Sequence, residues 1–262
     1  MEKGKSSTTS FLERCLTDEI KLDIDCFLKD SDEREFLSFS SLEQVNNVFG
    51  ALADSFNLSL NEEDKSTIKT YTGIGYKEIN AIARDNWNYE INGRKTAELE
   101  QYYKNVTDVM ERVIHKFPSL GLDIKVYRGA FLKQFFEYGI RSLDDLEAMQ
   151  GKFFYDAGFT STSLCRDDSL LGVSAFLSGE RNVEIEYLVP SECQDGILLM
   201  GEEGSYYSSE NEFLFNRDSL AKITNVEIDK ENNKAFMRAV LIPRTLWDPY
   251  AYKKINGDSK ST

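Results

Sequence analysis

Apolar residues recur at every third or fourth position through most of the first third of the chain. Such spacing places them on one face of a helix. Ser41, followed by Gln44, has the pattern of a helix N-cap, and Asn61 precedes three acidic residues that suit a first helical turn. We therefore predict helices over 11–29, 41–56, about 76–83 and about 96–116, with a further helix opening at Asn61.

The pattern changes after Gly121, where apolar and polar residues begin to alternate as they do in strands. A short helix capped by Ser142 is predicted over 142–150. Strands are predicted at 123–128, 152–155, 158–163, 183–189, 196–200, 211–215, 219–228 and 235–242. The fold class is therefore α+β: a helical N-terminal region packed on a mixed, mostly antiparallel two-sheet β core. We expect an N-terminal helical extension over 1–58, a main domain over 59–247, and a disordered tail over 248–262.

Charge excludes two classes of partner. The 262 residues include 31 Lys and Arg against 45 Asp and Glu, a net charge of −14. Such a chain has no bulk attraction for nucleic acid or for an anionic membrane. No segment approaches the roughly 20 apolar residues of a membrane span, and the polar residues 1–10 do not resemble a classical signal peptide. We expect a mature form numbered from 1, a cytosolic protein, or one that leaves its cell without such a signal.

Cysteine and histidine usage excludes further chemistry. No pair among Cys15, Cys26, Cys165 and Cys193 has CxxC spacing, so we expect free thiols and no metal site. The single histidine, His115, lies in the predicted helix 96–116. A hydrolase that pairs a serine or cysteine nucleophile with a histidine base is therefore improbable, and His115 is expected at the helix surface or in its last turn.

Three segments of the β region could carry chemistry. Arg128 ends a strand-like run, and a guanidinium there can grip a pyrophosphate or carboxylate, or form a structural ion pair. Residues 158–163 place a run of hydroxyl side chains, Thr160 to Ser163, on a strand, which also suits an ordinary threonine-rich strand. In the segment 201–215, Glu210 and Glu212 are two residues apart, so in extended geometry both carboxylates face the same side. There they suit either a solvated strand edge or an acid pair with divided tasks.

The order of these segments is more specific than any one of them. Arginine on a strand, then aromatic-x-Ser-Thr-Ser, then Glu-x-Glu resembles the R-S-E class of arginine-specific mono-ADP-ribosyltransferases, especially the catalytic components of bacterial binary toxins that modify actin. Residues 71–76 (YTGIGY) and 79–84 (INAIAR) resemble the toxins' Tyr-Thr-Gly-x-x-Tyr and Ile-Asn-x-x-Leu-Arg motifs, with Ala83 in place of the usual leucine. The resemblance covers about residues 60–245, the ADP-ribosyltransferase domain.

The resemblance implies NAD as co-substrate and assigns residues that bind it. Arg128 would bind the NAD pyrophosphate, and Arg84 would be a second phosphate contact. Tyr71 and Tyr76 would flank the cofactor, and Asn80 of the same helix belongs to the binding set. No metal is expected.

The resemblance also assigns the reacting residues. Ser161 would position Glu212 and the nicotinamide ribose, and Glu212 would stabilise the oxocarbenium ion formed as nicotinamide leaves. Glu210 would orient and deprotonate the incoming arginine. In relatives that modify asparagine this position is an amide, so a carboxylate points to arginine. Tyr207 occupies the position of an aromatic that helps recognise the target.

The function implied is transfer of ADP-ribose from NAD to an arginine of actin or of another protein. The enzyme would be a bacterial toxin or effector, secreted or injected into a target cell cytosol, with its N-terminal helices available to a translocation or secretion partner. Two alternatives remain open: an NAD glycohydrolase, which uses water as acceptor, and an inactive binding module of the same fold.

Overall fold

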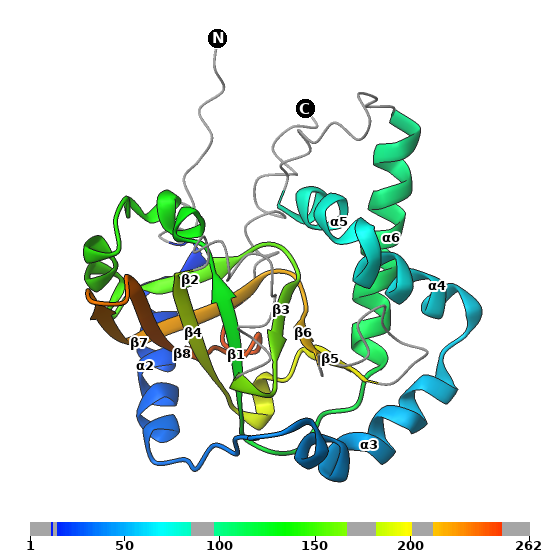
Figure 1. Ribbon diagram of the computed structural model, residues 1–262, viewed down its shortest axis with the longest axis horizontal. Helices are drawn as coiled ribbons and strands as arrows, with labels where there is room; N and C mark the ends of the chain where they lie inside the picture. The colour runs from blue at the N-terminus through cyan, green and yellow to red at the C-terminus, as the bar shows by residue number, and fades with distance from the viewer. Residues whose placement is uncertain (1–11, 13–14, 85–96, 167–181, 201–211, 248–262) are drawn as a thin grey trace.

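The computed structural model describes residue 12 and residues 15–84, 97–166, 182–200 and 212–247. Within them the helices fill the N-terminal part and the strands the rest, as the hydrophobic pattern predicts. Figure 1 shows α4, α5 and α6 grouped beside one end of the sheet, with α2 at the other. The expected tail over 248–262 lies outside the described residues.

Side-chain caps fix the starts of the helices. Thr17, Ser41 and Asn61 each accept a hydrogen bond from a backbone N–H of the first helical turn, and Asn61 and Asp64 form a reciprocal capping box. The helices are α2 (Asp18–Asp32), α3 (Leu42–Ser59), α4 (Glu62–Thr70), α5 (Tyr76–Ala83) and α6 (Ala97–Lys116). The predicted helices are therefore confirmed with bounds shifted by a few residues, except at the start of the first. That helix begins at Asp18 and not at residue 11, because the extended Thr17 caps it.

Two features differ in detail from the expected helices. A π-helical turn, Tyr71–Gly75, joins α4 directly to α5. The predicted helix over 142–150 is a 3₁₀ helix at Asp144–Met149. Its N-cap is Leu143 and not the expected Ser142, although the Ser142 hydroxyl accepts from the backbone N–H of Asp145 at 3.3 Å. Further 3₁₀ helices lie at Leu132–Tyr138 and Ser191–Cys193.

Every predicted strand is present among the described residues. The strands are β1 (Ile124–Ala130), β2 (Phe153–Asp156), β3 (Thr160–Ser163), β4 (Val183–Val189), β5 (Gly196–Leu199), β6 (Glu212–Phe215), β7 (Ser219–Asp229) and β8 (Lys234–Leu241). They form one sheet of order β2-β7-β8-β4-β1-β3-β6-β5. The β4–β8 pair is parallel and the other pairs are antiparallel, so the sheet is mixed and mostly antiparallel, as expected.

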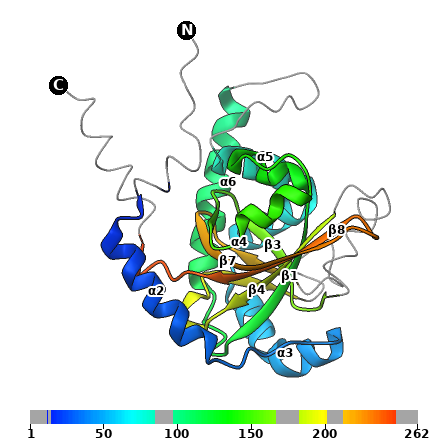
Figure 2. The same ribbon diagram turned by 90° about the vertical axis from the view of Figure 1, so that its left-hand side faces the viewer.

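The two expected sheets are joined into this single one. Strands β1 and β3 share one pair of opposed residues, Tyr127 and Ser163, whereas β1 and β4 are paired along their whole length. A five-stranded part ending at β1 and a three-stranded part beginning at β3 thus meet at one point and diverge on either side of it. The strong twist of the sheet is visible in Figure 2. This divergence matters because Arg128 follows the shared pair directly.

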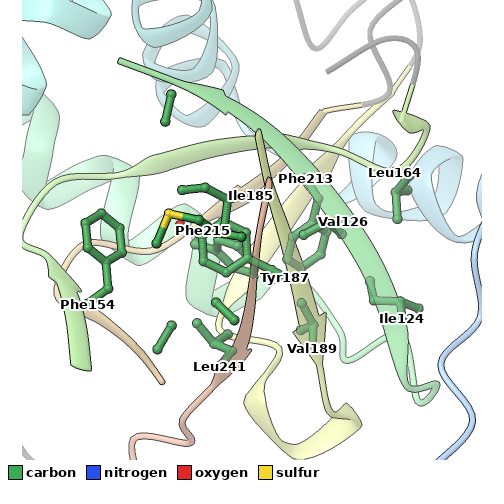
Figure 3. Close-up of a cluster of buried hydrophobic side chains, with 14 of the residues drawn as sticks. Ile124, Val126, Phe154, Leu164, Ile185, Tyr187, Val189, Phe213, Phe215 and Leu241 are labelled. Carbon is green, nitrogen blue, oxygen red and sulfur yellow. The ribbon is translucent and has the colours of Figure 1, made fainter. Parts of the chain in front are cut away.

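Three groups of buried apolar side chains hold the helices to the sheet. The largest includes Ile124, Ile185 and Phe213, and Figure 3 shows members of this group distributed along the sheet. A second group joins α4, α5 and α6 to β5 and β6 through Ile79, Met110 and Leu214, among others. The third seats α2 against Leu220 and Trp247, among others. The helices nearest the N-terminus therefore share the core of the sheet.

Candidate active site

Arg128 is a mostly buried cation on β1. Its side chain is 15 % exposed, and its Nη1 lies 3.6 Å from Oδ2 of Asp156. That nitrogen is buried, and no residue in the described part of the chain accepts a hydrogen bond from it. A buried donor without an acceptor costs free energy, and an anionic ligand would supply the acceptor.

Asp156, the last residue of β2, brings the two predicted arginines to one carboxylate. Arg84 donates from Nε to Oδ1 at 3.0 Å and from Nη2 to Oδ2 at 3.1 Å, which is a bidentate pair. The backbone N–H of Gly158 and the hydroxyl of Thr160 also donate to this carboxylate, which is 10 % exposed. Asp156 was missed by the sequence reading. The available signal was Asp two residues before Gly, which is typical of an Asx turn.

Gly158 lies where a side chain would collide with this arrangement. A Cβ at this position would stand 2.7 Å from Cζ of Arg84 and 2.7 Å from Oδ1 of Asn80. The residue therefore has to be glycine for α5 and the start of β3 to approach this closely.

Asn80 fastens α5 to the start of β3. Its Oδ1 accepts from the backbone N–H of Phe159 at 2.7 Å, and its Nδ2 donates to the hydroxyl of Tyr71 at 3.3 Å. The Tyr71 and Phe159 rings meet edge to face with their centroids 5.6 Å apart. Asn80 and Tyr71 are both buried, so each has a structural role in addition to the binding role expected from the sequence.

The pKa of the Tyr71 hydroxyl is shifted by burial and by charged neighbours. Burial raises the pKa of its hydroxyl well above the ordinary value, and the charge of Glu212 raises this pKa further. The hydrogen bond from Asn80 and the charges of Arg128 and Arg84 act in the opposite direction. The net effect raises the pKa of Tyr71, so the phenol stays neutral at physiological pH.

The π-helical turn gives the two predicted tyrosines different environments. Gly73 inside the turn has a non-helical conformation, and a Cβ at Gly75 would stand 2.6 Å from the carbonyl oxygen of Thr70. The turn ends as α5 begins with Tyr76, whose side chain is 45 % exposed. Tyr71 is therefore buried, whereas the side chain of Tyr76 is accessible to solvent.

Glu212 opens β6 and is partly buried. In the β3–β6 pair it lies opposite Ser163, whereas Ser161 lies opposite Leu214. Ser161 is exposed, and Ser163 is buried with its Oγ accepting from the backbone N–H of Cys165. Ser161 is therefore a diagonal neighbour of Glu212, and the nearer serine is one that the sequence reading gave no role.

Two predicted site residues, Glu210 and Tyr207, lie outside the described residues. In the described ranges, no three His, Cys, Asp or Glu side chains are grouped so as to hold a metal ion. The same ranges contain no helix with the length and apolarity that crossing a membrane requires. His115, in the last turn of α6, is half exposed and lies 3.6 Å from Asp195, as expected for a helix-surface histidine.

The family profile described as ADP-ribosyltransferase exoenzyme matches residues 46–243. The chain belongs to this family. The match spans the π-helical turn, α5 and every described strand, so it contains the whole of the site. The resemblance and the fold expected from the sequence are thereby confirmed. No curated protein matches the sequence.

Solved structures of ADP-ribosyltransferases share this fold. C3stau2 from S. aureus, solved with NAD, superposes with a TM-score of 0.61 at 19 % identity over 80 % of this chain and 100 % of its own. The enzymatic component C2-I of the C2 toxin from Clostridium botulinum superposes with a TM-score of 0.57 at 18 % identity. The match covers 80 % of this chain and 50 % of C2-I. Vis toxin from Vibrio splendidus, solved with agmatine, superposes with a TM-score of 0.54 at 18 % identity. The match covers 82 % of this chain and 91 % of Vis toxin. At such identities the likeness concerns the fold alone.

Proposed function

We propose that this toxin-like ADP-ribosyltransferase transfers a single ADP-ribose from NAD to an arginine side chain of a target protein and releases nicotinamide. The observation that carries the proposal is the pairing of Arg84 and Arg128, from distant segments, with the carboxylate of Asp156. Glu212 lies close enough for its charge to raise the pKa of the neighbouring Tyr71. Two cations beside a carboxylate suit a substrate that has an anionic pyrophosphate next to a reacting ribose.

NAD is the co-substrate, and the arginines fit its phosphates. Arg128 has a buried Nη1 for which the described residues provide no acceptor, so a phosphate oxygen would complete its hydrogen bonds. Arg84 uses its Nε and Nη2 on Asp156 and keeps Nη1 for a second phosphate contact. Tyr76 is exposed at the start of α5 and supplies an aromatic face. The C3stau2 structure was solved with NAD, which agrees with this assignment.

Glu212 is proposed to stabilise the positive charge that develops on the ribose. The bond between the ribose C1 and the nicotinamide nitrogen breaks, and its electron pair leaves with nicotinamide. A carboxylate close to C1 lowers the energy of this cationic transition state. Ser161 is exposed, so its hydroxyl can contact the ribose while it lies diagonally across from Glu212.

Glu210 is proposed to prepare the acceptor. An arginine side chain is always protonated in water and is a poor nucleophile in that state. A carboxylate can orient the guanidinium and take one proton as its nitrogen bonds to C1. Glutamate at this position favours arginine over an amide acceptor. Vis toxin was solved with agmatine, which contains the same guanidinium group, and this supports an arginine-like acceptor. Tyr207 is proposed to contact the target protein beside it.

The target is proposed to be actin or another protein with an exposed arginine, reached after secretion or injection into the target cell. The net charge of −14 would attract a cationic acceptor surface. The N-terminal helices are the proposed contact for a delivery partner.

The test is to incubate the purified protein with NAD and either agmatine or cell lysate. We expect one ADP-ribose per modified arginine by mass spectrometry, with nicotinamide release stimulated by the acceptor. Equal nicotinamide release with and without acceptor would identify a glycohydrolase. NAD binding without turnover would identify a binding module, and the absence of both would refute the proposal.

A further inference from the structure

We infer that Asp156 is a positioning residue for NAD: it holds Arg84 and Arg128 in the geometry that receives the pyrophosphate. The inference rests on the proposed function and adds to it a residue that neither the sequence motifs nor the family match assigns. It is carried by the contacts of this one carboxylate with four groups from three separate segments.

The first step concerns the number of donors that Asp156 satisfies. Arg84 Nη2 also lies 2.9 Å from Oδ1. The Nε and Nη2 edge of the Arg84 guanidinium therefore contacts both carboxylate oxygens. Gly158 N–H donates to Oδ1 at 2.9 Å and the Thr160 hydroxyl donates to Oδ2 at 3.0 Å. A mostly buried carboxylate with this many donors is held in one orientation.

The second step concerns what the pair leaves available. Arg84 is held at its Nε edge, so its remaining amino group points away from Asp156. Arg128 lies within ion-pair distance, with Nη1 3.6 Å from Oδ2, but the two atoms are too far apart for a hydrogen bond. Asp156 therefore offsets the charge of Arg128 without using its donors, which remain for a ligand.

The third step concerns electrostatics. Two guanidinium groups on one carboxylate leave a net charge of +1 in a chain whose total is −14. Without Asp156 the two arginines would repel each other and at least one would turn toward solvent. With it, both stay beside Tyr71 before the substrate arrives, so less ordering remains to be done on binding.

The test is the Asp156→Asn variant, measured by steady-state kinetics with NAD. We expect KM for NAD to rise by roughly ten- to a hundredfold, the range for losing a charge-assisted hydrogen bond, with kcat nearly unchanged. Pyrophosphate contacts are the same before and during bond breaking, which is why KM alone should move. A lower KM would mean that Asp156 only opposes the anion, and an unchanged KM would mean that it has no part in binding; either result would overturn the inference.

Two further variants separate positioning from folding. Thr160→Val removes one donor to Asp156 and keeps the side-chain shape at a buried position, so we expect a smaller rise in KM without loss of the fold. Asp195→Asn is the matched control, because Asp195 pairs with Nε of Arg244 at 2.6 Å outside the site. Its KM should equal that of the unmodified protein.

A measurement without NAD keeps the inference distinct from the proposed function. We expect the Arg84 Nε–H to be protected from solvent exchange by NMR in the unmodified protein and exposed in Asp156→Asn. An unprotected Arg84 in the unmodified protein would refute the pair itself. If the unmodified protein does not bind NAD, the proposed function fails, whatever the state of Arg84. If it binds NAD and Asp156→Asn binds equally well, only the inference fails.

Discussion

Ser163 and Glu212 lie directly opposite each other across the β3–β6 pair, at the point where β1 also meets β3 through Tyr127. The position of Glu212 is therefore set by the backbone pairing at the junction of the two parts of the sheet. Its nearest serine is buried, whereas the serine assigned to catalysis by resemblance, Ser161, is exposed.

This arrangement predicts different effects for the two serines. Ser161→Ala should lower kcat for nicotinamide release by roughly tenfold, because an exposed hydroxyl that contacts the ribose contributes about one hydrogen bond. It should not change the melting temperature. Ser163→Ala should lower the stability by about 1 kcal/mol, because the backbone N–H of Cys165 loses its acceptor. Thermal unfolding and single-turnover kinetics on both variants measure these effects. The prediction is wrong if Ser161→Ala is fully active.

Substitutions of Glu210 and Glu212 should affect different reactions. Glu212→Gln should reduce both nicotinamide release and transfer by about 10²–10³-fold, since the charge that stabilises the transition state is lost. Glu210→Gln should abolish transfer to agmatine while it leaves hydrolysis of NAD by water near its original rate. Parallel assays of nicotinamide and of ADP-ribosylated agmatine measure the two reactions. Full transfer by Glu210→Gln would contradict the assignment of the acceptor residue.

Gly158 should tolerate no side chain. In Gly158→Ala the new Cβ would stand 2.7 Å from both Arg84 and Asn80, so one of them has to move. We expect a loss of about 1–3 kcal/mol in unfolding free energy from overpacking and a raised Kd for NAD. Urea unfolding and calorimetric titration with NAD measure both. Gly151→Ala is the comparison, because its positive φ gives strain but nothing lies within 4 Å of its Cβ. It should lose stability without a change in NAD affinity.

The sequence contained the local features of the fold but not its long-range contacts. The caps at Ser41 and Asn61 locate the helix starts because capping depends on residues within one turn. The turn at Asp156 has a local signal, but its pair with Arg84 could not be recognised, since it joins residues 72 positions apart. Alternation puts Ser161 and Ser163 on one face, but only the strand register decides which of them faces Glu212.

Buried tyrosines should make the protein sensitive to alkali. Burial raises the pKa of Tyr71, Tyr138 and Tyr187, so each stays protonated in the folded state at a pH where the unfolded chain has begun to lose its phenol protons. Their contribution to stability is therefore complete below about pH 10, the unfolded value, and is lost as the pH rises toward the folded-state pKa.

Urea unfolding at about pH 8 and about pH 11 should accordingly show a fall in unfolding free energy, with these phenols titrating only as the protein unfolds. Tyr187→Phe should make that fall smaller, because one of the three raised groups is removed. Tyr102→Phe is the control, since Tyr102 is half exposed and its substitution should leave the fall unchanged. If the unfolding free energy is the same at both pH values, these phenols are accessible to solvent. The assignment of Tyr71 as a buried, neutral phenol in the site would then be wrong.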